Sequence, residues 1–196
     1  MDLEKKDKKE SILLATLELV AEHGFHGAPT AMIAERAGVG IGTIYRYFDD
    51  KDMLIYEVHR ELELKICEYI LSGFQEEYSY RQRFVYFCSV LLQYLIDNPK
   101  EFKFMEQFYN SPYGVELRRD RIFSEAPECE NSCILKDLFE QGRKHGLIKD
   151  VPLLIFFALV FGPIIAAARD HILGFITLDD NLIGSFVEAC WDSVKK

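Results

Sequence analysis

The sequence lacks the motifs that usually reveal an enzyme. It contains no HExxH pair of zinc ligands, no GxSxG nucleophile turn and no glycine-rich phosphate-binding loop. Its five histidines are scattered rather than grouped at metal-ligand spacing: they are His23, His26, His59, His145 and His171. We therefore expect no enzymatic activity, no catalytic residues, no cofactor and no bound metal.

The long apolar segments of secreted and membrane proteins are also missing. The first residues, MDLEKKDKKES, carry charges but no apolar region of a signal peptide. The most apolar run covers residues 153–168 and contains Gly162 and Pro163. It is shorter than the roughly 20 residues needed to cross a bilayer. We expect a cytoplasmic protein that has no membrane partner.

Nothing in the sequence completes a metal site around the five cysteines. A cytoplasmic location keeps cysteines reduced. Cys129 and Cys133 are separated by three residues, which suits a metal-binding or thiol-sensing pair on a loop. No CxxC motif or histidine pair supplies the other ligands, so we favour coincidence.

The chain has no excess of positive charge. It contains 23 Lys and Arg against 32 Asp and Glu, giving a net charge of −9. This balance excludes a protein that coats nucleic acid by bulk electrostatics, but it allows a small DNA-reading surface on an acidic body. With 49% hydrophobic and 28% charged residues, the composition is that of a globular protein.

Strand-type alternation of apolar and polar residues is absent, and almost every segment has helical spacing instead. Three compact helices are predicted in the first 48 residues or so, followed by a long helix that starts at Asp49 or Asp50. Later helices include residues 80–97 and 151–174. We predict an all-α fold of about nine helices, with a short N-terminal domain and a larger helical domain.

Two short predicted helices near the N-terminus are joined by a glycine-rich turn, an arrangement typical of a helix-turn-helix. The second helix follows Pro29, with Thr30 as its N-cap, and ends in ERAG; the turn reads GVGI, and the third helix reads GTIYRYF. Gly38 suits the left-handed conformation that ends a helix. Ile44 and Phe48 are four residues apart, so both face the core.

The other residues of the third helix suit contact with DNA, because glycine allows close approach and hydroxyl groups bond to bases or phosphates. These residues are Gly42, Thr43, Tyr45, Arg46 and Tyr47. Polar aromatic residues beside so much glycine have no evident use in a core. We predict a helix-turn-helix DNA-binding domain over residues 1–50 and a helical effector-binding and dimerisation domain over residues 51–196.

Residues 9–55 resemble the N-terminal domain of the TetR family of bacterial transcriptional regulators. The resemblance lies in the stretch ILLATLELVAEHGFHGAPTAMIAERAGVGIGTIYRYFDDKDML. It implies a homodimer that binds a palindromic double-stranded DNA operator, acts as a repressor and is released by a small hydrophobic ligand. Carried over by position, it implies DNA contacts at Thr30, Gly40, Ile41, Gly42, Thr43, Tyr45, Arg46, Tyr47 and Lys51.

The sequence departs from this family at two of those positions. Many members have Ser where this chain has Gly40 and Lys where it has Ile41. A hydroxyl cap and a cation are therefore missing, and we expect operator affinity to depend on Tyr45, Arg46, Tyr47 and Lys51. An alternative role for Ile41 is packing against a thymine methyl group.

The larger domain is rich in aromatic residues, which suggests an apolar effector pocket between helices. The predicted lining residues are Phe84, Phe87, Leu91, Tyr94, Phe104, Met105, Phe108, Tyr109, Phe157 and Phe161. Ordinary core packing is the alternative for each of them. The effector itself is not identified by the sequence.

The last two helices are the predicted dimer seam, because small residues there permit close helix packing. The predicted interface residues are Ile165, Ala168, Ile172, Ile183, Phe186, Val187 and Cys190. Packing within one chain is the alternative reading. For the whole protein, the competing hypothesis is a helical protein-interaction or ligand-binding module that does not bind DNA.

Overall fold

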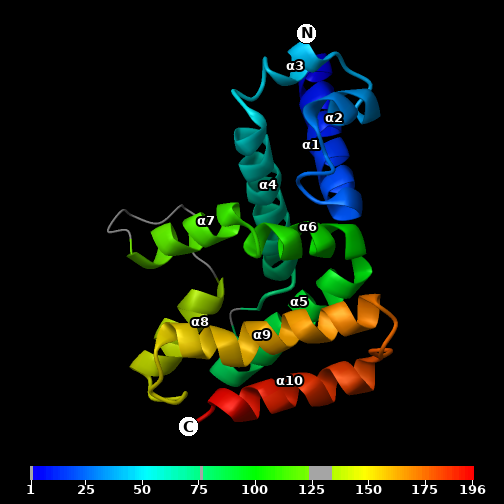
Figure 1. Cartoon of the computed structure of the whole chain (residues 1–196). Coiled ribbons are helices and arrows are strands. Elements are labelled where there is room, and N and C mark those ends of the chain that lie inside the picture. Colours follow the sequence, from blue (N-terminus) through cyan, green and yellow to red (C-terminus); the bar gives the residue numbers. More distant parts are fainter. Residues whose placement is uncertain (1, 76, 124–133) are drawn as a thin grey trace. The chain divides into compact units, whose positions relative to one another are not determined.

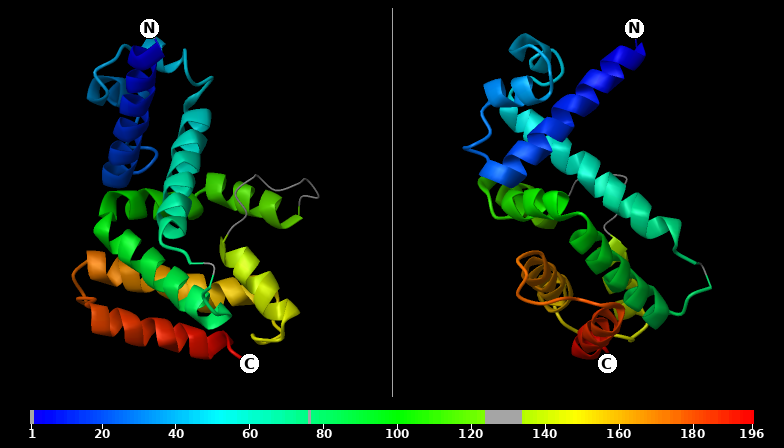
Figure 2. Two further views of the ribbon diagram at one scale, coloured as in Figure 1. Left: turned by 180° about the vertical axis from the view of Figure 1, so that it is seen from behind. Right: turned by 90° about the vertical axis from the view of Figure 1, so that its right-hand side faces the viewer.

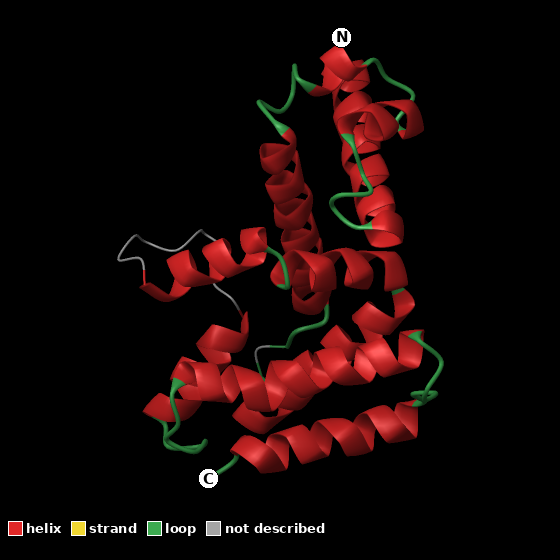
Figure 3. Ribbon diagram, viewed as in Figure 1, coloured by secondary structure: helices red, strands yellow, loops and turns green. Residues whose placement is uncertain are grey.

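The computed structural model describes residues 2–75, 77–123 and 134–196. Within these ranges the chain forms ten helices and no strand, which confirms the all-α prediction with one helix more than the approximate count (Figures 1 and 3). The one β-type contact in the described chain is an isolated bridge between Ile148 and Lys195.

The chain divides into two compact units that interleave along the sequence. The first unit comprises Met1–Leu64 and Pro99–Ala126, and the second comprises Lys65–Asn98 and Pro127–Lys196. This division describes packing. The boundary predicted after Asp50 concerns where DNA binding ends and effector binding begins, and it stays a prediction.

The first unit contains the helix-turn-helix segment and two helices from the middle of the chain. Its helices are α1 (Asp2–His23), α2 (Thr30–Arg36), α3 (Ile41–Ile44), the part of α4 (Lys51–Ser72) up to Leu64, α6 (Pro99–Tyr109) and α7 (Pro112–Phe123). Helix α6 packs against α1 and α7, and α2 packs against α1 and α3. Pro99 and Pro112 are each the first residue of a helix, where proline lacks only a donor that would be unbonded in any case.

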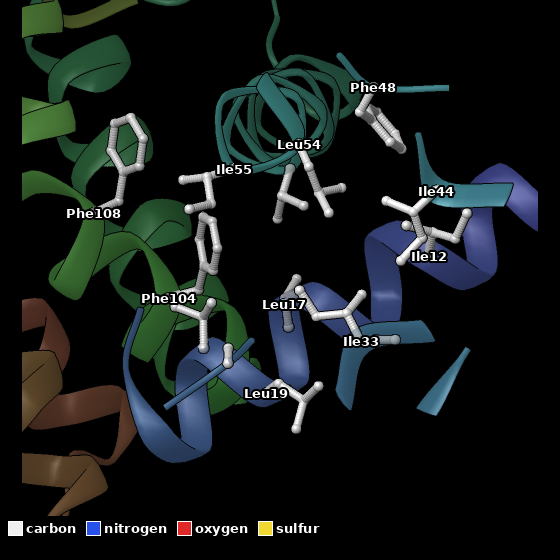
Figure 4. Close-up of a cluster of buried hydrophobic side chains, with 14 of the residues drawn as sticks. Ile12, Leu17, Leu19, Ile33, Ile44, Phe48, Leu54, Ile55, Phe104 and Phe108 are labelled. Atoms are coloured by element: carbon white, nitrogen blue, oxygen red, sulfur yellow. The ribbon is translucent and has the colours of Figure 1, made fainter. Parts of the chain in front are cut away.

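One hydrophobic core joins the helices of the first unit. Figure 4 shows Ile12 of α1, Ile33 of α2, Ile44 of α3 and Phe104 of α6 among the buried side chains that point toward one another. On α4, the buried residues of the same cluster are Leu54, Ile55, Val58 and Leu62. Because each helix gives one apolar face to this core, the short helices α2 and α3 are held by packing rather than by their own propensity.

The second unit is built on α5, α9 and α10. It contains the end of α4, α5 (Tyr80–Asp97), α8 (Ile134–Lys144), α9 (Leu153–Ile172) and α10 (Asp180–Val194). Helices α5, α9 and α10 pack against one another, and α8 packs against α5 and α9 (Figure 2). Ser79 and Gln82 form a capping box at the start of α5, and Asp179 accepts a hydrogen bond from the Leu182 amide at the start of α10.

Helix α9 continues through Pro163 and extends beyond the apolar run seen in the sequence. Among the described residues it is the one helix that is long and apolar enough to cross a membrane by length and composition, so the length argument against a span was wrong. Only 22% of its apolar window is buried within the chain. A large part of this apolar helix is therefore not buried within the chain.

Candidate nucleic-acid interface

The turn between α2 and α3 is set by one glycine in the left-handed conformation. Gly38 has φ of 67°, its amide donates to the Glu35 carbonyl, and the Val39 amide donates to the Ala34 carbonyl. This pair of bonds is a Schellman motif, which satisfies the last carbonyls of α2 and redirects the chain. The predicted role of Gly38 is confirmed.

Helix α3 is fixed by two side chains on its inner face. Ile44 and Phe48 are 1% and 6% exposed and belong to the core of the first unit. Regular helix ends at Ile44, but the Phe48 amide still donates to the Ile44 carbonyl, so the turn carries the second side chain inward. The predicted inward spacing is confirmed.

The outer face of α3, taken to include the preceding Gly40 and the turn that follows Ile44, is uncovered. Ile41 is 46% exposed and Tyr45 is 52% exposed, one helical turn apart. Gly40, Gly42 and Arg46 are also exposed. Arg46 makes no ion pair with any residue that the structure describes. The face thus offers an apolar group, a phenol and a guanidinium group to a partner.

Neither Gly40 nor Gly42 is required by the fold of the chain. A Cβ atom added at either position would meet no atom within 4 Å, and neither residue has a left-handed φ. Glycine in a helix costs stability relative to alanine, so the packing of the chain does not explain why residue 42 is glycine. Close approach of another surface to the α3 backbone would explain why these positions are glycine.

Three other residues predicted to contact DNA are less exposed to solvent: Thr30, Thr43 and Tyr47. Thr30 is half-buried and begins α2; it is not the N-cap, which is Pro29, and that prediction was wrong. Pro29 already holds the extended conformation of a cap residue, with φ −67° and ψ 151°, so Thr30 falls inside the first turn. Thr43 and Tyr47 are half-buried, and the Tyr47 ring lies 6.3 Å from that of Phe48.

Lys51 stabilises the fold of the chain at the start of α4. Its Nζ donates to the carbonyl of Phe25, in the loop after α1, at 2.5 Å. Burial lowers the pKa of Lys51 from its ordinary value. The Met53 amide donates to Asp50, which settles the alternative between Asp49 and Asp50 as cap of this helix.

Ion pairs hold α1 against α2 and α4. Arg36 of α2 donates to Glu22 at 3.1 Å, and Lys9 of α1 donates to Glu57 of α4 at 2.6 Å. Arg60 also donates to Glu57, and hydrogen bonds from Arg60 and Lys9 lower the pKa of Glu57 to about 2. These cations thus form ion pairs within the chain.

Residues beyond the predicted DNA-binding domain also hold α1 and α4, and sequence reasoning missed them. Gln107 of α6 donates to the Val20 carbonyl at 2.8 Å, and Tyr113 of α7 donates to Asp52 at 2.7 Å. Burial, followed by the bond to Asp52, raises the pKa of Tyr113 to about 12. Their partners lie far away in sequence, so no local pattern could have indicated them.

The predicted pocket residues fall in both units. Phe104 and Phe108 are fully buried in the core of the first unit, and Met105 and Tyr109 pack against that core. In the second unit, Phe157 and Phe161 are half-buried on α9. The other four are buried on α5: Phe84, Phe87, Leu91 and Tyr94.

Two open hollows lie on the second unit, and none of the predicted pocket residues lines them. The larger, of about 320 Å³, lies among α4, α5 and α10 and is lined by Tyr69, Ser89, Val90, Gln93, Asp180, Ile183 and Gly184. The smaller, of about 240 Å³, is lined by Tyr78, Arg81, Gln82, Val85 and Tyr86. The location of an effector pocket stays a prediction.

The predicted interface residues divide into two groups. Those buried within the single chain are Ala168, Ile183, Val187 and Cys190. Ile165, Ile172 and Phe186 are half-buried. The exposed face of α9 instead carries Ala158, Gly162 and Ala166, which recur every four residues.

Metal binding has no candidate in the part of the chain that the structure describes, where no group of three His, Cys, Asp or Glu side chains could hold an ion. Cys129 and Cys133 lie outside the described residues. Cys88 and Cys190 are buried, and burial raises the pKa of both thiols, to about 11 for Cys190. Such thiols are poorly reactive.

Two family models match the chain and together span most of it. The model described as bacterial regulatory proteins, tetR family, matches residues 12–58. The model described as tetracyclin repressor-like, C-terminal domain, matches residues 79–195, which is more than half of the chain.

Individual relatives agree with these models. A helix-turn-helix-type transcriptional regulator of Haemophilus influenzae is 25% identical over 98% of both chains. The crystal structure of a TetR family regulator from Marinobacter aquaeolei matches with a TM-score of 0.84 and 24% identity, covering 100% of both chains. The regulator FadR from Bacillus subtilis, solved in complex with stearoyl-CoA, matches with a TM-score of 0.70 and 17% identity, covering 93% of this chain and 95% of that one.

Proposed function

The chain belongs to the TetR family of bacterial transcriptional regulators, and we propose that it represses genes by binding a palindromic operator as a homodimer. In this proposal a small hydrophobic ligand binds the helical domain and releases the DNA. The protein acts in the bacterial cytoplasm, where its operator lies.

The observation that carries this proposal is the outer face of α3. Its inner face is closed by Ile44 and Phe48, whereas the outer face presents Tyr45, Arg46 and two glycines that the subunit does not need. A recognition helix places such a face against base edges in the major groove. We propose that Gly40, Ile41, Gly42 and Thr43 lie near the bases. Thr30, Tyr45, Arg46 and Tyr47 then bind phosphates or base edges, and Lys51 fixes the start of α4.

Dimerisation is proposed through α9 and α10. A single short recognition helix reads too few bases, and two-fold symmetry matches a palindrome with half-sites about 34–36 Å apart. The exposed small residues Ala158, Gly162 and Ala166 allow a second α9 to approach closely. The half-buried Ile165, Ile172 and Phe186 extend the same contact.

We propose a fatty acyl chain as the effector. The support is the FadR structure with stearoyl-CoA and the aromatic composition of the second unit, where Phe157 and Phe161 are half-buried. A ligand that fits only a conformation with wrongly spaced recognition helices weakens operator binding by its difference in affinity for the two states.

The effector is tested with purified protein, stearoyl-CoA and coenzyme A. Stearoyl-CoA is expected to raise the melting temperature and lower the affinity for DNA from upstream of the protein's own gene, whereas coenzyme A alone does neither. Phe161→Ala is expected to weaken the response, and Phe175→Ala, in an exposed loop residue, to preserve it. An unchanged melting temperature and DNA affinity with stearoyl-CoA would reject an acyl effector.

A further inference from the structure

Ile41 is the exposed apolar side chain of the recognition helix. It is 46% exposed and belongs to no part of the buried core. Its neighbours Gly40 and Gly42 have no side chains, and a Cβ atom at either would meet nothing within 4 Å. The Ile41 side chain is therefore about half exposed, and the positions before and after it in the chain carry no side chain.

Tyr45 is a second exposed side chain near Ile41. The two residues are four apart, about one helical turn, and both side chains are exposed, whereas Ile44 and Phe48 are buried. When a helix-turn-helix binds DNA, the first residues of its recognition helix contact base edges. Ile41 is the second residue of the segment GIGT, in that region of the helix.

Only one apolar group is offered by the bases in the major groove of unmodified DNA. It is the C5 methyl of thymine, while the other groups are hydrogen-bond donors and acceptors. An isoleucine cannot bond to those groups, and burying it against them would leave them unsatisfied. A thymine methyl is the matching surface.

The way in which the cations of the first unit are paired makes an apolar contact of Ile41 with DNA more important for affinity. Arg36 and Lys9 are paired with glutamates, and Lys51 donates to a backbone carbonyl. Arg46 is the open cation on the face that α3 presents. Because Arg36, Lys9 and Lys51 are engaged within the chain, they are less available to phosphates, and contacts to bases gain weight in the affinity.

We propose that Ile41 reads the C5 methyl group of one thymine in each operator half-site. This inference rests on the proposed function, because it requires that the protein bind an operator. The glycines on either side let the backbone come near enough for the methyl group to reach the isoleucine.

The test replaces single thymines by deoxyuracil, which removes the methyl group and keeps every hydrogen bond. The operator is first selected from random duplex DNA by the protein itself, and affinities are then measured by fluorescence anisotropy. At one thymine per half-site, the substitution is expected to weaken binding about fourfold, and about 15-fold when both half-sites are changed.

Ile41→Ala supplies the decisive comparison. Because Ile41 is exposed, the variant is expected to keep the wild-type melting temperature. It should bind the thymine operator as weakly as wild type binds the uracil operator, and it should not distinguish the two. Tyr45→Phe is the matched control and should still discriminate against uracil at that position.

The possible failures are distinguishable. If no operator can be selected and no DNA is bound, the proposed function itself fails. If an operator is bound but uracil has no effect at any thymine, or if Ile41→Ala discriminates as strongly as wild type, the function stands and the role of Ile41 is rejected.

Discussion

At the residue scale, substitution of Gly42 is expected to change folding stability and DNA affinity in opposite directions. Gly42→Ala is expected to stabilise the protein by about 0.5 kcal/mol, because alanine favours helix and its methyl group meets no atom. The same variant should bind the operator at least about tenfold more weakly, because the methyl group holds the backbone away from DNA. Urea denaturation and fluorescence anisotropy measure the two effects.

Gly38→Ala is the matched control for this prediction. Gly38 has φ of 67°, so alanine there is strained, and we expect a loss of about 1 kcal/mol in unfolding free energy. A Gly42→Ala variant that loses stability like Gly38→Ala, or that binds DNA as wild type does, would refute the assignment of Gly42 to close DNA approach.

Lys51 and Arg46 differ in what they do for the subunit. Lys51→Met removes the hydrogen bond to the partly buried Phe25 carbonyl and is expected to cost about 1 kcal/mol of stability. Arg46→Ala, at an exposed side chain, should change stability by less than about 0.5 kcal/mol while weakening operator binding. Equal stability of the two variants in urea would contradict the structural role of Lys51.

Sequence reasoning at this scale succeeded where the interaction is local. Ile44 and Phe48 could be placed inward from their spacing alone, and Gly38 from the need to end a helix. Thr30 was misplaced because Pro29 is itself able to take the cap conformation. The bond from Lys51 to the Phe25 carbonyl depends on tertiary packing and has no local signature.

At the element scale, Glu57 connects α4 to α1 and makes part of the stability depend on pH. Hydrogen bonds from Arg60 and Lys9 lower its pKa from 4.5 to about 2 in the folded chain. A lowered pKa contributes stability that is present above pH 4.5 and is lost as the pH falls toward 2. Acidification through this range therefore loosens the contact between the two helices.

Glu57→Gln tests this contribution. The variant is expected to be about 1–2 kcal/mol less stable than wild type at pH 7, after allowing for solvent screening. Below pH 4.5 the difference should shrink as the wild-type carboxylate is protonated. Glu61→Gln, at a more exposed glutamate that also pairs with Arg60, should change stability little. A difference that is constant from pH 7 to pH 3 in urea titrations would rule out the ionic origin.

The sequence predicted where helices begin and end better than it predicted which segments pack against them. Helix α5 begins and ends at the predicted residues, because its apolar spacing and its capping residues agree. Helix α10 begins at Asp180 because the Asp179 side chain caps it. The aromatic residues of α6 could not be assigned to a core in advance, because spacing shows which face is apolar and not what covers it.

At the scale of the whole molecule, the open face of α9 is the part that a second subunit would cover. Gly162→Leu is expected to shift the protein from dimer to monomer, because a leucine separates two helices that approach over Ala158, Gly162 and Ala166. The subunit itself tolerates the change, since a Cβ at Gly162 meets no atom within 4 Å. Sedimentation velocity at micromolar concentration measures the shift.

Gln141→Leu is the control for this prediction, because it adds the same side chain at an exposed position of another helix, α8. It should leave the dimer intact. A Gly162→Leu protein that sediments as wild type does would exclude this stripe from the subunit contact and leave the half-buried residues of α10 as the alternative.

Which helices pack together in one unit was harder to predict than the helices themselves. The first packing unit takes α6 and α7 from the middle of the chain in addition to the N-terminal helices. Gln107 and Tyr113 belong to it through bonds to Val20 and Asp52. Contacts between distant segments are set by the complete core, and one sequence alone carries no direct record of them.

The most direct test of the central claim is the affinity of the purified protein for DNA from immediately upstream of its own gene. Fluorescence anisotropy at physiological salt should give a Kd of about 10⁻⁸ M, and scrambled DNA should bind far more weakly. The Tyr45→Ala, Arg46→Ala double variant, which keeps the fold because both side chains are exposed, should lose at least about tenfold in affinity. Equal affinity for scrambled DNA, or an undiminished affinity of the double variant, would contradict the claim that the outer face of α3 reads an operator.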